Sequence, residues 1–499
     1  MRGAGVLSRR FARQRQTRWS WVLGAAALCG CAAGPDFRPP EPIAVATYTP
    51  APQPALAEAS PGPGGAAQRL VPADAIGSGW WRTFGSPALD RLVQQALDNS
   101  PTLAQARMRL EQARQDYLAQ AGATEWPQLD ATLNATRQKV DPAAFGIGGL
   151  TGGRSFPPFT LYSAKVSVSY TLDFFGANRR ALEALAAQVD YQQYELDAAR
   201  LSLAGNVVTT AVRRASLAKQ IVLTGDLLAD QKRQLDITEQ RYQAGGVSRL
   251  DLLSQRSQVE QTRASLAPLR TQLAQADHQL AVYLGRPPAQ LAPGGSDDPA
   301  ELDLDAFVLQ SEVPLTLPST LAQQRPDIRA SEALLHQASA NVGVASAHLY
   351  PQITLSAGTG PEGVSVTDMM NLWSVGAGLT QPLFHGGQLQ AQKRSAQAAY
   401  EAALAVYRQT VLQGLQQVAD ALRALQQDAI ELQSRDQAQR DAHVSAEIAS
   451  QRYAAGGISQ LVLLDTQRQE MQTSLDRTKV QAQRLADVAA LYQALGARP

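Results

Sequence analysis

Two very long stretches without proline constrain the fold of this chain more than any other feature. Proline is absent from Phe159 to Ala267 and from Leu383 to Arg498. Within them the sequence predicts uninterrupted helices over Ala177–Ala244 and Gln388–Ala454, the latter about 100 Å long at about 1.5 Å per residue. Apolar residues recur at helical spacing, and alanine fills many seam positions, which lets neighbouring helices pack closely. The pattern favours long antiparallel helices over an ordinary globular core.

Each long helix ends in nearly the same segment, "RYQAGGVSRLDLL" from Arg241 and "RYAAGGISQLVLL" from Arg452. The glycine pair resists helix formation and favours a C-terminal cap. Ser248 and Ser459 are each predicted to cap the helix that follows. Each copy therefore predicts a tight turn at the tip of a long helical hairpin.

The two segments belong to a duplication of domain size. Each half is predicted to run helix, strand, loop, strand, long helix, turn, long helix. The first repeat covers 87–300, with strands at about 127–138 and 163–173, a glycine-rich loop at 139–162 and a tip at 245–248. The second covers 301–499, with strands at about 351–360 and 372–381, the loop "PEGVSVTDMMN" between them and a tip at 456–459.

The N-terminus has the pattern of an exported lipoprotein. Residues 1–30 combine a basic start with the short apolar segment "WSWVLGAAAL", which is typical of a signal peptide. "LCGC" then resembles a bacterial lipobox, in which Cys31 would become the acylated first residue. Ala32 after it points to the outer membrane. Residues 31–86 are expected to form the lipidated N-terminal leader, which is rich in Pro, Ala and Gly up to residue 78.

Several function classes are excluded or disfavoured by the residues. A net charge of +1 provides no field for nucleic acid. The five histidines show no metal-ligand spacing, and no cofactor or catalytic residue is expected. "GGLTGGRS" imitates a phosphate-binding loop, but "FPPFT" after it cannot start the required helix. After the signal, no apolar stretch is long enough for a transmembrane helix, so any bilayer-spanning part would have to be a closed β-barrel.

The chain resembles the outer-membrane factor family of tripartite efflux pumps, the family of TolC and OprM, and most closely its NodT-like lipoprotein branch. The segments that carry the resemblance are "GPDFRPPEP", "WWRTFGSPALDRLVQQALDNSPTLAQA", "RPDIRASEALLHQASANVGVASAHLYPQITLSA", "QPLFHGGQLQA" and both "RYxAGG" turns. Together they extend over essentially the whole chain after Cys31.

The resemblance implies a mainly α chain with a small β part. Three copies would form a helical periplasmic tube continuous with a twelve-stranded outer-membrane β-barrel, four strands from each. Residues 287–318 would contribute to an equatorial belt. The implied function is passive conduction of drugs or other small molecules from the periplasm to the exterior, with no enzymatic activity. The implied partners are two further copies, a periplasmic adaptor, an inner-membrane pump of the RND type and outer-membrane lipid. The alternative is that the chain is itself a periplasmic adaptor lipoprotein.

The resemblance also assigns roles to residues near the tips. Leu461 and Asp465, which share a helix face, match an apolar constriction and an acidic ring at the periplasmic gate. The first repeat has Leu250 and Ser254 there instead. The turns, Gly245, Gly246, Val247 and Ser248 with Gly456, Gly457, Ile458 and Ser459, match the adaptor-docking region.

The residues that precede the turns have two interpretations that stay open. Arg241, Tyr242, Arg452 and Tyr453 are candidates for links between neighbouring hairpins. The alternative for the two arginines is the ordinary role of a cation near a helix C-terminus.

Overall fold

The computed structural model describes residues 32–41, 45, 47–49, 62–73, 77–139, 157–290 and 299–497. The signal peptide, Cys31 and most of the 139–162 loop, including "GGLTGGRS", lie outside the described residues. The chain divides into two compact units. Unit 1 comprises Met1–Pro39, Glu111–Tyr191 and Glu332–Val406, and unit 2 comprises Pro40–Leu110, Gln192–Ser331 and Tyr407–Pro499.

The same series of elements occurs twice along the chain. The first series is α3 (Pro101–Glu125), β2 (Gln128–Gln138), β3 (Phe159–Leu172), α4 (Ala177–Gln243) and α5 (Arg249–Tyr283). The second is α7 (Pro326–Ala347), β5 (Gln352–Ser365), β6 (Asp368–Thr380), α8 (Gln388–Ala454) and α9 (Gln460–Ala494). Helices α4 and α8 have 67 residues each, and α5 and α9 have 35 each. The fold is therefore mainly helical and internally duplicated.

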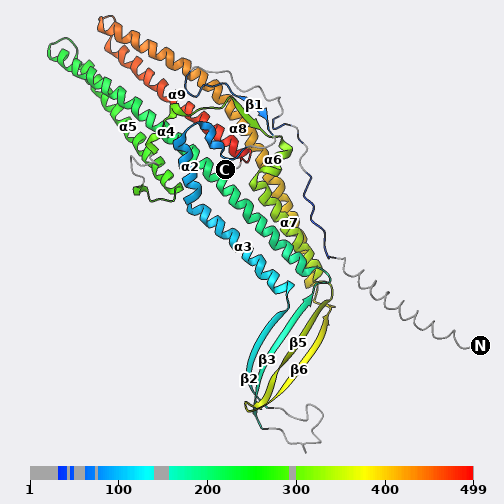
Figure 1. The fold of residues 1–499 in the computed structure, drawn as a ribbon. Helices are drawn as coiled ribbons and strands as arrows, with labels where there is room; N and C mark the ends of the chain where they lie inside the picture. Colours follow the sequence, from blue (N-terminus) through cyan, green and yellow to red (C-terminus); the bar gives the residue numbers. More distant parts are fainter. Residues whose placement is uncertain are drawn as a thin grey trace, which may run out of the picture. The chain divides into compact units, whose positions relative to one another are not determined.

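The sheet of unit 1 has four antiparallel strands in the order β2-β3-β5-β6 (Figure 1). The predicted loop at 361–371 is wrong, because β5 continues to Ser365 and β6 already begins at Asp368. Pro361 and Gly363 were signs of a loop, yet Pro361 and Glu362 are paired with Asn371 and Met370 of β6. Strand β3 likewise begins at Phe159, inside the other predicted loop.

The two faces of this sheet differ in polarity. Cross-strand partners share a face. One row across all four strands is Leu129, Val168, Ala357 and Val375, and the adjacent row is Asp130, Ser167, Gly358 and Ser374. Large apolar side chains stay exposed in the single chain, with Leu133 84% and Trp373 77% exposed. One face is thus suited to an apolar environment and the other to water.

Unit 2 contains the largest buried aromatic side chains. A short 3-10 helix, η1 (Trp80–Phe84), precedes α2 (Pro87–Asn99). Trp81 and Phe84 are each 1% exposed, and the Trp80 ring stacks on Tyr492 of α9 with centroids 5.3 Å apart. Along the chain, the segment between α5 and α7 contains the short helices η3 (Pro288–Gln290), η4 (Pro299–Glu301), η5 (Leu304–Ala306) and α6 (Pro318–Gln324).

The leader from residue 62 onward is part of the folded structure of unit 2. Strand β1 (Arg69–Pro72) pairs in parallel with β4 (Glu312–Leu315). Arg484 of α9, 1% exposed, donates from Nη1 to the Gly64 carbonyl and from Nη2 to the Ala66 carbonyl, both at 2.8 Å. A buried guanidinium needs such acceptors. The leader supplies them, so its backbone stabilises a charge on α9.

Both helical hairpins reach their turns within unit 2; α4–α5 is green in Figure 1 and α8–α9 orange to red. The seam of the first hairpin contains Leu228, Val259 and Leu266. The second has an ion pair between Asp436 and Arg477 at 2.7 Å, with the Asp436 side chain 3% exposed. Across the described parts of the chain, no helix is both long enough and apolar enough to cross a membrane.

Candidate functional site

The two hairpin turns have the same backbone structure. The first glycine of each pair has a left-handed conformation, with φ of 75° at Gly245 and 77° at Gly456. The second glycine donates its N–H back across the turn, from Gly246 to the Arg241 carbonyl at 2.7 Å and from Gly457 to the Arg452 carbonyl at 2.8 Å. This is the Schellman arrangement that ends a helix. The sequence "AGG" specifies it because a left-handed residue favours glycine.

The helices that follow the turns begin differently. Ser248 forms a capping box, since its Oγ accepts from the Asp251 N–H at 3.2 Å and the Asp251 carboxylate accepts from the Ser248 N–H at 3.1 Å. Ser459 occupies the predicted N-cap position with the corresponding extended backbone, but its side chain makes no cap hydrogen bond. In that copy the residue three positions after the serine is Val462, which cannot complete the box.

Leu461 and Asp465 both lie exposed on the first turns of α9. Leu461 is 71% exposed, although it is a large apolar residue. The Asp465 side chain is 67% exposed and forms an ion pair with Arg468 on the next turn. In the first repeat Leu250 is similarly 74% exposed. Exposed leucines at matching places in both copies mark a surface that is available for contact.

The structure brings two of the four candidate link residues together. The Arg241 guanidinium of the first hairpin lies over the Tyr453 ring of the second, with Cζ 5.8 Å from the ring centroid. A cation over an aromatic face is attracted by the negative potential of the ring. Among the described residues, the side chains of Tyr242 and Arg452 have no hydrogen bond or ion pair. The residues thus form one contact between the hairpins.

A buried amide cluster was missed by the sequence reasoning. Gln460, the first residue of α9, is 5% exposed and donates from Nε2 to Gln255 Oε1 at 3.0 Å and to Thr238 Oγ1 at 3.3 Å. Gln255 in turn donates to the Gln231 carbonyl at 3.2 Å. The cluster joins α9 to α4 and α5. Its only sequence signal is a glutamine at an apolar seam position between Leu252 and Val259.

Two titratable contacts lie farther along the second hairpin. His443 and Glu470 approach to 2.5 Å, and this hydrogen bond raises the pKa of the histidine. Burial, followed by a hydrogen bond to Asp487, raises the pKa of Asp428 to about 8. Asp428 Oδ2 is buried without a hydrogen-bond partner. The Asp428 carboxyl therefore keeps its proton to a higher pH than an ordinary aspartate does.

Among the described residues, no group of three His, Cys, Asp or Glu side chains is placed to hold a metal ion. In unit 1, His336 Nε2 lies 3.0 Å from a carboxylate oxygen of Glu183. That carboxylate also accepts from Arg180. These residues form an ion-pair network, with no third metal ligand among them.

Comparison with known proteins gives consistent results. The family model described as "Outer membrane efflux protein" matches residues 92–286 and 317–497. The pyoverdine export outer membrane protein OpmQ of Pseudomonas putida is 32% identical over 84% of this chain and 87% of its own length. The probable efflux pump outer membrane protein TtgC of the same species is 31% identical over 96% and 94%. The solved structure of the outer-membrane channel OprN matches with a TM-score of 0.79 and 27% identity, covering 93% of this chain and 99% of that chain.

Proposed function

This chain belongs to the outer membrane efflux protein family, whose members are the outer-membrane channels of tripartite pumps, and we propose that it conducts drugs or other small organic molecules passively from the periplasm to the exterior. The observation that carries this function is the duplicated pair of long hairpins together with a strand pair in each half. The alternative of a periplasmic adaptor is not supported, because the family match extends over both halves.

The family works as a trimeric channel with an adaptor and an inner-membrane pump. Within such an assembly, the gate would consist of three copies of Leu461 and Asp465 at the inner end of the helical tube. The exposure of both side chains supports this role. Three facing carboxylates would attract cations and repel one another. Closure would therefore rest on apolar contact between the leucines and on links between hairpins, including Arg241 with Tyr453.

Arg468 is expected to reduce the cation preference of this acidic ring. Its guanidinium pairs with the Asp465 carboxylate within the same helix. Exposed ion pairs of this kind stabilise little, about 0–1 kcal/mol, and are screened by salt. The pair nevertheless places a positive charge beside each ring carboxylate. We expect a cation preference weaker than that of three unpaired aspartates.

The adaptor would contact the two turns, Gly245–Ser248 and Gly456–Ser459. Both are exposed over most of their length and share one backbone structure, so they offer the adaptor two similar surfaces. At the other end of the chain, Cys31 would carry the lipid anchor in the outer membrane. Cys31→Ser should abolish incorporation of radioactive palmitate, whereas Cys29→Ser should not.

Ion conduction by the purified protein in a planar bilayer tests the gate. The unmodified channel should conduct poorly, prefer cations and be blocked by trivalent cations from the periplasmic side at low salt. Asp465→Ala should remove most of the block, and Leu461→Ala should raise conductance because the constriction widens. Arg468→Gln should strengthen the block, since the carboxylate loses its partner.

Repeating the conductance measurement at high salt distinguishes effects of side-chain charge from effects of constriction width. The screening length falls from about 10 Å at 0.1 M to about 3 Å at 1 M. The effects of Asp465→Ala and Arg468→Gln should shrink accordingly, and that of Leu461→Ala should not. Unchanged block in Asp465→Ala at low salt would make this residue an ordinary exposed carboxylate and remove it from the gate.

A further inference from the structure

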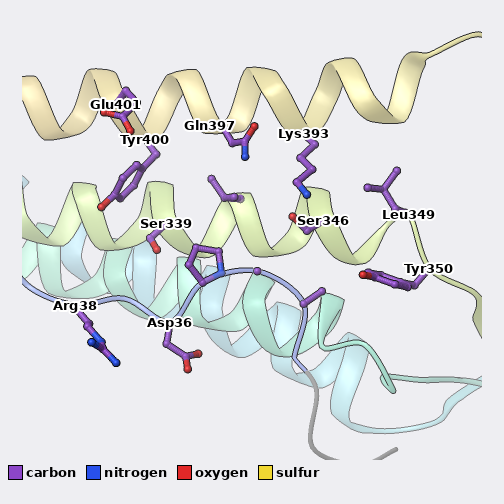
Figure 2. A pocket seen from close by; sticks show the side chains of 14 residues that line it. Asp36, Arg38, Ser339, Ser346, Leu349, Tyr350, Lys393, Gln397, Tyr400 and Glu401 are labelled. Carbon is purple, nitrogen blue, oxygen red and sulfur yellow. The ribbon is translucent and has the colours of Figure 1, made fainter.

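Unit 1 contains a cavity of about 590 Å³ that the channel function does not use. Leader residues from Ala33 to Arg38 form one wall, and the other two walls are α7 and the first turns of α8 (Figure 2). Its volume is within the range of about 300–1,000 Å³ that is usual for small-molecule sites. The lining is mixed, with apolar groups such as Val342 and Leu349 beside several polar side chains.

The leader wall of this cavity is firmly attached. Arg180, whose side chain is 6% exposed, donates to Asp36 Oδ1 at 2.6 Å. The Phe37 ring stacks on His336 with centroids 4.4 Å apart. Gly34 lies so close to Gly343 of α7 that a Cβ on it would meet the Gly343 Cα at 2.5 Å. The cavity is therefore a built feature of unit 1, held open by specific contacts.

Three polar side chains that line the cavity, those of Ser339, Ser346 and Lys393, lack hydrogen-bond and ion-pair partners among the described residues. Ser346 is 5% exposed and Ser339 is 3% exposed, yet neither hydroxyl makes a hydrogen bond within the described structure. The Lys393 ammonium has no carboxylate or carbonyl partner there either. Figure 2 shows Lys393 extending from α8 toward Ser346 on α7. A cation and the hydroxyl of a largely buried serine that face each other in a cavity without an acceptor are suited to an anionic oxygen ligand such as a phosphate.

One end of the cavity adjoins the sheet that has an exposed apolar face. Leu349 and Tyr350 line this end, and β5 begins at Gln352. The leader wall starts at Ala33, two positions after the predicted lipid anchor at Cys31. In an outer-membrane protein, both features place this end at the membrane boundary, where lipid phosphates lie. Glu401 also lines the cavity, but it is about 12 Å along α8 from Lys393, so its carboxylate need not oppose a phosphate there.

We propose that this cavity binds the headgroup of a membrane phospholipid. The Lys393 ammonium and the Ser346 hydroxyl donate to its phosphate, and the acyl chains leave past Leu349 and Tyr350 toward the membrane. The site is independent of the gate at Leu461 and Asp465, so either assignment can fail without the other.

The test is binding of dihexanoyl phosphatidylglycerol to the full-length protein, delipidated in detergent and measured by native mass spectrometry and calorimetry. Lys393→Gln should weaken binding about tenfold, as expected for loss of a charge-assisted hydrogen bond. Arg394→Gln is the matched control. It removes the same charge from the next position of α8, which does not line the cavity, and should bind like the unmodified protein. Ser346→Leu should also weaken binding, because it removes a donor and fills space.

Three results would overturn the proposal. Equal loss in Lys393→Gln and Arg394→Gln would indicate general attraction to the basic surface. Inorganic phosphate that competes as well as the lipid would indicate an anion site without lipid recognition. Stronger phospholipid binding by Cys31→Ser would mean that the cavity normally holds the protein's own acyl chain. We expect no change in the last case and weak competition by inorganic phosphate.

Discussion

The Arg241 guanidinium lies 5.8 Å from the centre of the Tyr453 ring, and so the last turns of α4 and α8 are in contact. Such contacts stabilise by about 0.5–1 kcal/mol at exposed sites. Arg241→Gln should raise the open probability of the channel in a planar bilayer a few-fold. Arg452→Gln is the control, since its side chain has no partner among the described residues. An equal rise in both variants would show that only local charge matters.

The buried amide cluster should contribute more than this exposed contact. Gln460→Leu leaves the polar groups of Gln255 and Thr238 with fewer partners. We expect a loss of about 1–3 kcal/mol, seen as a lower thermal unfolding temperature. Gln451→Leu, at an exposed position of α8, should leave that temperature unchanged. A Gln460→Leu protein as stable as the control would mean that the cluster stabilises nothing.

The two glycines of the second turn should respond differently to alanine. Gly456 has a φ of 77°, which costs a residue with a Cβ about 1–2 kcal/mol. Gly457 does not have a positive φ, and a Cβ there would meet the Arg452 carbonyl at an ordinary 3.5 Å. Hydrogen exchange at the turn amides should accelerate about 5- to 30-fold in Gly456→Ala. Similar rates in Gly456→Ala and Gly457→Ala would contradict the turn geometry.

Asp428 should make the protein less stable as the pH rises. Its pKa is about 8 in the folded chain, against an ordinary value of 3.8 for aspartate, so folding binds a proton between these values. Stability is therefore lost as the pH rises from about 4 to about 8. Asp428→Asn should remove this dependence and add about 1–2 kcal/mol at pH 8, less than the full pKa difference implies because the carboxyl is partly exposed.

Unfolding temperatures measured from pH 5 to 9 would check this effect. Asp441→Asn is a suitable control, because Asp441 lies on the same helix with an exposed carboxyl bonded to Gln437. Its pH profile should follow that of the unmodified protein. Parallel profiles for Asp428→Asn and the unmodified protein would place the titrating group elsewhere.

Local patterns made the helices and turns predictable. The helix expected over Gln388–Ala454 has those bounds in α8, because proline-free periodic sequence and a glycine pair determine both its length and its end. The loop at 361–371 was wrongly predicted because Pro361 lies where the pairing of β5 with β3 is interrupted, between Thr359 and Glu362, and a strand tolerates proline at such a place. Ser459 is the N-cap residue of α9, as its sequence position indicates, but Val462 three positions later has no carboxylate or amide to complete a capping box.

Contacts between segments that are distant along the chain could not be predicted from the sequence. A glutamine in a helical seam can face solvent or a buried partner, and only the packing of α4, α5 and α9 places Gln460 against Gln255 and Thr238. The sequence of the leader predicts only an extended, proline-rich segment. Its attachment to Arg484 joins parts of the chain more than 400 positions apart. No local pattern contains that information.

The equal lengths of α4 and α8, and of α5 and α9, limit how this chain can evolve. One residue inserted into α8 would rotate Tyr453 by about 100° and shift it by about 1.5 Å, away from Arg241. A compensating insertion would be needed in the other repeat to restore the contact. Most substitutions along these helices disturb the contact between the hairpins less than an insertion does, because they leave the helix length unchanged. The two repeats can therefore diverge in sequence while their helices keep the same number of residues. Helix length is then under stronger evolutionary constraint than the identity of most residues along the helices.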